Sequence, residues 1–218
     1  MAEEGTKHPK KSARQRIANK TRQIIHVLYN SGNINKAGLA YLRQSKSMTS
    51  PKAMMVLPDF MRFMDADMIS QSGELTRAEV AVFTAVRLYA FHQQSKDVSV
   101  YGPVNTNTND SEEPLGKQIF TVLRELRKNL KTRQALDGRV QQILGATNIA
   151  SVNNSLNQLI RIIKSADLSI PIDYGLLARD LFDFQMSYEQ ANRVRLRWGQ
   201  QYFKNIVDDQ TDNNEGEK

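Results

Sequence analysis

The segment from Leu75 to Gln94, LTRAEVAVFTAVRLYAFHQQ, restricts the fold most, because it is apolar on almost every side of a helix. Thr76 and Glu79 have the spacing of a capping box, which predicts where this helix begins. A helix without a polar face has to be covered by other elements all round. We therefore predict that it lies at the centre of a bundle of helices.

The other periodic segments also favour helices, and no convincing alternating strand pattern or long internal repeat is present. Ser12, Asn148, Asp173 and Ser187 are suitable N-cap residues. The sequence predicts an all-α, two-lobed helical bundle of about eight to nine helices, divided by a loop rich in Asn, Thr, Ser, Gly and Pro. The predicted parts are a disordered basic N-terminus at 1–12, an N-terminal helical lobe at 13–94, a polar loop at 95–113, a C-terminal helical bundle at 114–207 and a disordered acidic tail at 208–218.

The positive charge is unevenly distributed along the chain. The net charge of the 218 residues is +7. Residues 1–52 carry 11 Lys/Arg against 2 Asp/Glu, residues 53–116 carry 4 against 9, and residues 117–168 carry 9 against 3. Two basic blocks separated by an acidic one favour a polyanionic partner. The alternative is a basic protein with no specific partner for its charge.

Catalytic chemistry has little support in the residue types. The chain has no cysteine and three histidines, which excludes disulfides, cysteine-ligated zinc and iron–sulfur clusters. Walker A, HExxH, GxSxG and dinucleotide-binding patterns are absent. We expect no enzymatic activity, no metal and no cofactor. No apolar run reaches the roughly 18 residues of a membrane span, and a secretory signal core is absent, so we expect a cytoplasmic protein without membrane contact.

Two groups of aspartates were considered as sites. Asp59, Asp65 and Asp67 lie close in sequence and suggest a metal-dependent nuclease as one hypothesis. They fall at different angles of a helix, so a solvated acidic face is favoured. Asp180 and Asp183, beside Arg179, are better interpreted as part of a structural network.

The segment PLGKQIFTVLRELRKNLK, residues 114–131, is predicted to form one helix with a basic stripe. At about 100° per residue, Lys117, Arg124, Lys128 and Lys131 fall within about 60° of one another, opposite the apolar face. The stripe would be about 20 Å long. A row of this kind can meet successive phosphates of a nucleic-acid backbone. The alternative is a solvated basic face.

The last predicted helix contains three arginines at alternate positions, Arg193, Arg195 and Arg197, before the only tryptophan, Trp198. Arg193 and Arg197 would flank the buried face, while Arg195 would point elsewhere. Arginine can lay its stem on apolar surface and keep its head group in water. The sequence leaves open whether these head groups grip phosphates or pair with Asp180, Asp183 or Glu189.

Several segments, in order, resemble the CasB family, the small subunits of the type I-E CRISPR Cascade complex. They are LAYLRQS, VRLYAFHQQ, PLGKQIFTVLREL, LDGRVQQIL, LIRIIKS, IPIDYGLLARDLFDF and VRLRWGQQYF. The resemblance covers most of residues 38–204. The chain departs from the family pattern at Gln201 and in the Asn-rich segment 103–113.

The resemblance implies a non-catalytic, all-helical subunit whose partners are other Cascade subunits, a second copy of itself, the CRISPR guide RNA, and the target and non-target DNA strands. Its basic faces would hold nucleic-acid backbone and keep the R-loop open. The runner-up hypothesis is a free-standing helical adaptor that binds acidic proteins. The predicted nucleic-acid-binding residues are Arg43, Lys117, Arg124, Lys128, Lys131, Arg139, Arg161, Arg193, Arg195 and Arg197.

Overall fold

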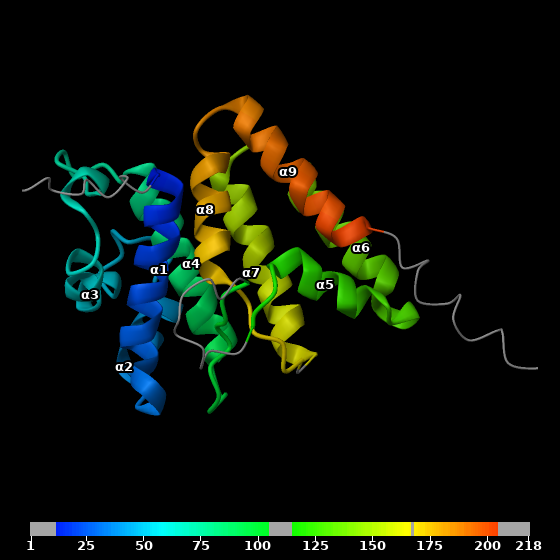
Figure 1. Ribbon diagram of the computed structural model, residues 1–218, viewed down its shortest axis with the longest axis horizontal. Helices are drawn as coiled ribbons and strands as arrows, with labels where there is room; N and C mark the ends of the chain where they lie inside the picture. The colour runs from blue at the N-terminus through cyan, green and yellow to red at the C-terminus, as the bar shows by residue number, and fades with distance from the viewer. Residues whose placement is uncertain (1–11, 105–114, 167, 205–218) are drawn as a thin grey trace, which may run out of the picture.

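The computed structural model describes residues 12–104, 115–166 and 168–204, and within them the chain forms nine α-helices and no strand (Figure 1). The all-α prediction is confirmed. The N-terminal half contains α1 (Ala13–Tyr29), α2 (Lys36–Gln44), α3 (Leu57–Met61) and α4 (Arg77–Gln93). The C-terminal half contains α5 (Ile119–Arg127), α6 (Leu130–Leu144), α7 (Ile149–Ser165), α8 (Tyr174–Phe184) and α9 (Tyr188–Phe203).

Helix α4 is the buried centre that its composition predicts. It packs against α1, α2, α7 and α8. Its start is set by the predicted capping box: the Glu79 N–H donates to Thr76 Oγ1 over 3.1 Å, and the Thr76 N–H donates to Glu79 Oε2 over 2.7 Å. The prediction of a central helix is therefore confirmed together with its first turn.

Helix α8 connects the two halves of the molecule. It packs on α1 and α4 on one side and on α9 on the other (Figure 1). Gly175 permits the approach to α1, because a Cβ at this position would lie 2.9 Å from the Ala18 carbonyl oxygen. On the other side Trp198 of α9 stacks on Phe184 of α8, with ring centroids 6.3 Å apart. The apolar core is continuous between the halves, so α1 and α9 are held at fixed positions beside α8.

The start of the predicted polar loop packs into the molecule. Val100 and Tyr101 are buried, and the Ile172 N–H donates to the Val100 carbonyl over 2.9 Å. Segment 115–118 pairs with the same extended segment, residues 171–172, since the Lys117 N–H donates to the Pro171 carbonyl over 2.9 Å. Gly116 is required here, because a Cβ would lie 1.9 Å from the Gly102 carbonyl oxygen. The rest of that loop, 105–113, and the acidic tail at 208–218 lie outside the described residues, as does 1–11 of the predicted N-terminal segment.

Candidate nucleic-acid interface

The predicted single helix over residues 114–131, with its stripe of four cations, is wrong. Lys117 is extended and forms a bridge with Ile172, so Gln118 becomes the N-cap and α5 begins at Ile119. Helix α5 ends after Arg127, and α6 begins at Leu130 with a new direction (Figure 1). Lys131 therefore belongs to α6, and its side chain is outside the described part of the chain. Helical periodicity continued through both breaks, which is why the sequence pattern did not reveal them.

Three of the four predicted cations nevertheless gather around one carboxylate, Glu125. Lys128 Nζ lies 2.9 Å from Glu125 Oε2, while Lys117 Nζ and Arg124 Nη2 lie 3.9 and 4.0 Å from Oε1. The hydrogen bond from Lys128 holds the pKa of Glu125 below its ordinary value, against the effect of burial. In this α5 cluster (Lys117, Arg124, Lys128), three cations share the carboxylate of Glu125.

The three arginines of α9 have different partners within the molecule. Arg193 pairs with Glu189 one turn earlier in the exposed part of the helix. Arg195 Nη1 donates to the Ala146 carbonyl over 3.2 Å, and its guanidinium lies 5.8 Å from the ring centroids of Phe184 and Tyr188. Arg197 Nη2 lies 2.7 Å from Asp180 Oδ1. The internal pairing that the sequence left open is thus realised for Arg193 and Arg197, and all three side chains have partners in their own chain.

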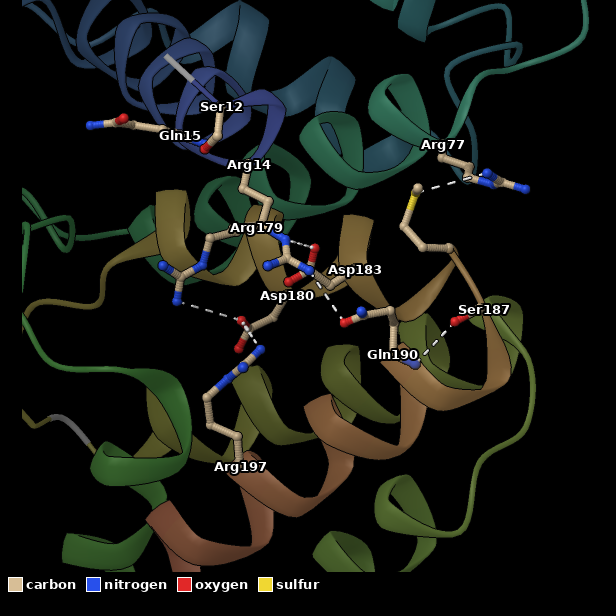
Figure 2. Close-up of polar contacts among 11 residues, drawn as sticks. Ser12, Arg14, Gln15, Arg77, Arg179, Asp180, Asp183, Ser187, Gln190 and Arg197 are labelled. Atoms are coloured by element: carbon tan, nitrogen blue, oxygen red, sulfur yellow. Dashed lines mark hydrogen bonds and ion pairs between the residues drawn. The ribbon is translucent and has the colours of Figure 1, made fainter. Parts of the chain in front are cut away.

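Asp180 and Asp183 do form a structural network, and it orients arginines from three helices (Figure 2). Asp180 Oδ2 accepts from the Trp198 indole N–H over 2.8 Å, and Asp183 Oδ1 accepts from Arg14 Nε over 2.7 Å. Arg14 also donates to Gln190 Oε1 over 3.2 Å. Arg179, which the sequence placed beside these aspartates, approaches Asp180 Oδ1 to 3.9 Å. Arg14 was missed by the sequence reasoning; the i, i+3 spacing of the two aspartates was the available signal.

A second group of cations surrounds the C-terminal end of α4. We call Arg43 of α2, Arg87 of α4, and Arg161 and Lys164 of α7 the basic patch. Arg43 Nη1 donates to the Ala90 carbonyl over 3.3 Å, and Lys164 Nζ donates to Gln94 Oε1 over 2.9 Å. The end of a helix carries partial negative charge, which favours cations at this position. The predicted residues Arg43 and Arg161 are thereby brought together, with Arg87 and Lys164 added by the fold.

No carboxylate within the described residues pairs with any of the four side chains of the basic patch. Phe91 lies between two of them, with its ring centroid 5.0 Å from the Arg87 guanidinium and 5.7 Å from that of Arg161. Burial lowers the pKa of Lys164, and the charges of Arg43, Lys96 and Arg161 lower it further. The patch therefore holds like charges close together without an acid to offset them.

The remaining predicted cation, Arg139, is exposed on α6. It donates to the Ala135 carbonyl of its own helix over 3.4 Å. It lines a hollow of about 410 Å³ with Leu126, Ile162 and Ser165, which places it beside the last turn of α7. The fold does not bring it into the α5 cluster.

Two of the three aspartates of the nuclease hypothesis, Asp65 and Asp67, have structural partners. Asp65 lies 2.7 Å from Lys20 Nζ and 2.8 Å from Arg16 Nη2, and Asp67 also pairs with Arg16. Within residues 12–104, 115–166 and 168–204, no group of three or more His, Cys, Asp or Glu side chains could hold a metal ion. In the same part of the chain, no helix combines the length and apolarity needed to cross a bilayer.

Comparisons with known proteins agree with this architecture. A search of curated proteins gave no match. The crystal structure of CasB from Thermobifida fusca is similar, with a TM-score of 0.62 and 22% sequence identity over 88% of this chain and 99% of that one. The family model for CRISPR-associated protein Cse2 matches residues 38–203. The chain therefore belongs to the Cse2 (CasB) family and is a subunit of a CRISPR Cascade complex.

Proposed function

We propose that this chain is a non-catalytic nucleic-acid-binding subunit of a cytoplasmic, RNA-guided Cascade complex. Its basic surfaces hold guide RNA, target DNA and the displaced DNA strand, and so keep the R-loop open. A second copy of the chain and the other Cascade subunits are its protein partners. Family membership disfavours the free-standing adaptor that was the rival hypothesis.

The observation that carries the proposal is the basic patch. Like charges within reach of one another destabilise a fold unless opposite charges offset them. Carboxylates offset Arg14 of α1 and Arg197 of α9, whereas the described residues supply none to the patch. A polyanion supplies the missing negative charge, and a phosphate backbone supplies it at regular intervals.

A small number of such contacts is sufficient to keep an R-loop open, because of the free-energy balance of strand exchange. Replacing a DNA duplex by an RNA–DNA hybrid changes the free energy little, so modest protein contacts to the backbone shift the equilibrium toward the open R-loop. Contacts to phosphates carry no sequence information, and base pairing with the guide supplies that. We assign the same role to the α5 cluster, in which three cations surround Glu125, and to Arg139 and the α9 arginines.

The test is a double charge reversal in the patch, Arg161→Glu with Lys164→Glu. Binding of the full-length protein to a fluorescent single-stranded oligonucleotide is measured by anisotropy at several salt concentrations. Each lost phosphate contact should lower the slope of log K against log salt by about 0.7. We expect a slope smaller by about 1 to 1.5 and weaker binding at low salt.

The matched control is Lys52→Glu with Arg62→Glu, which changes the net charge by the same amount. These two cations also lie over aromatic rings, those of Tyr41 and Phe63, at 5.7 and 5.4 Å. The control should keep most of the wild-type slope. In reconstituted Cascade, the patch variant should also form a less stable R-loop. Equal binding and equal R-loop stability for the two variants would refute the proposal.

A further inference from the structure

A groove of about 720 Å³ lies between α1, α8 and α9, and guanidinium groups from all three helices border it. We call Arg14, Arg179 and Arg197 the arginine bay. Figure 2 shows these three side chains converging from separate helices on Asp180 and Asp183. Helix α1 reaches this position because Gly175 lets it approach α8 closely.

The charges in the bay are arranged in two layers. The side chains of Asp183 and Asp180 are 6% and 9% exposed, whereas those of Arg14, Arg179 and Arg197 are 49%, 32% and 35% exposed. The carboxylates therefore lie beneath, and the guanidinium groups face the groove. Asp173, which also borders the groove, is occupied: its oxygens accept from the backbone N–H groups of Leu176 and Val104, each over 2.9 Å.

The aspartates fix the arginines without exhausting their donors. Each guanidinium has five N–H groups in a rigid fork. The contacts to Asp183 and Gln190 occupy two of these groups on Arg14, and Arg179 approaches Asp180 only to 3.9 Å. Oriented arginines with spare donors match the planar oxygens of a phosphate group.

The groove also has the right size and position for one nucleic-acid strand. Its volume falls within the roughly 300–1,000 Å³ range of sites that enclose a small organic molecule, which suits a short stretch of single strand and is too small for a duplex. Gln118 borders the groove and is adjacent in sequence to Lys117 of the α5 cluster.

We infer that the arginine bay is a phosphodiester-binding site for a single nucleic-acid strand, separate from the basic patch. This inference rests on the proposed function and adds a requirement of geometry. The patch offers charge alone, whereas the bay offers arginine forks in fixed orientations. Lysine retains the charge but cannot form the paired N–H contacts.

The test uses substitutions that conserve charge, Arg14→Lys with Arg179→Lys, and the same anisotropy titration with full-length protein. We expect about tenfold weaker binding at an unchanged net charge, since a lost charge-assisted pair corresponds to about that factor. The matched control is Arg62→Lys with Arg77→Lys, since both residues are exposed. Arg77 is also shown in Figure 2, but it donates to Met186 Sδ over 3.8 Å and does not contact the aspartates of the bay in that view. The control should bind as wild type does.

The outcomes separate the two proposals. If the bay variant binds as tightly as wild type while the patch variant at Arg161 and Lys164 is weakened, the bay inference is wrong and the proposed function stands. If wild type shows no salt-dependent binding to the oligonucleotide, both are wrong. If the double variant unfolds at lower temperature than the control, Arg179→Lys alone decides, because its contact to Asp180 is the longest in the bay. A loss of binding by this single variant supports the bay, and wild-type binding overturns it.

Discussion

His92 should make the stability of this protein fall as the solution becomes acidic. The side chain is 1% exposed at the end of α4. Its Nδ1 lies 2.9 Å from Tyr174 Oη, and its Nε2 is buried without a hydrogen-bond partner among the described residues. Burial, together with the charges of Lys96 and Lys164, lowers the pKa of His92 from 6.5 to about 4. The folded protein therefore keeps this imidazole neutral.

The sign and size of the effect follow from proton linkage. Between pH 6.5 and about 4 the unfolded chain binds a proton at His92 that the folded chain does not. Stability from this group is complete above pH 6.5 and declines as the pH falls toward 4. At about 1.4 kcal/mol per pH unit, the loss between pH 7.5 and pH 4.5 is about 2.5 kcal/mol. This is a large fraction of the 5–15 kcal/mol that typically stabilises a domain.

The assay is urea unfolding of wild type and His92→Gln at pH 7.5 and pH 4.5. Glutamine is neutral at both pH values, so the variant reports the pH dependence of all other groups. Wild type should lose about 2.5 kcal/mol more than the variant between the two conditions. Parallel losses in the two proteins would show that His92 is protonated in the fold, and the reasoning about its burial would be refuted.

Two further predictions concern packing and hydrogen bonding. Gly116→Ala should lower the unfolding midpoint strongly, because the added Cβ would lie 1.9 Å from the Gly102 carbonyl oxygen. Gly138→Ala in α6 meets open space and should raise the free energy of unfolding by about 0.5–1 kcal/mol through helix propensity. Thermal unfolding of both variants tests this contrast, and a stable Gly116→Ala protein would contradict it. Tyr202→Phe removes the 2.6 Å hydrogen bond to Asp137 Oδ1, and we expect a loss of about 1–2 kcal/mol in urea unfolding; an unchanged free energy would mean that Arg127, 2.7 Å from the same oxygen, satisfies Asp137 alone.

Local signals predicted the helices well because they act within one or two turns. The capping residues Ser12, Thr76, Asn148, Asp173 and Ser187 all accept from the expected backbone N–H groups. The late start of α5 was missed because Lys117 is drawn into pairing with Ile172, 55 positions along the chain. A pattern of 3.6 residues cannot report a competing partner at that separation.

The candidate site was harder to predict than the helices for the same reason. Arg43 and Arg161 were selected singly from the sequence, but their meeting at the end of α4 depends on how α2 and α7 pack against it. Arg14 and Asp183 are 169 positions apart and form one ion pair. Charge counts along the chain located the basic blocks. Whether a given cation lies beside an acidic or a basic side chain depends on the tertiary structure, which those counts do not contain.

The arginine bay and the basic patch differ in the charge of the groups beside their cations. An arginine fixed on a buried aspartate has lost much of its freedom before any ligand arrives, so it adds contact geometry at little further cost in entropy. A lysine or arginine surrounded by other cations gains most from any nearby negative charge, whatever its orientation. The arginine bay should therefore discriminate between ligand shapes, and the basic patch should respond mainly to salt. Under the proposed function, a subunit that binds a strand without reading its sequence would use both: the patch would attract the backbone over a distance, and the bay would fix its position.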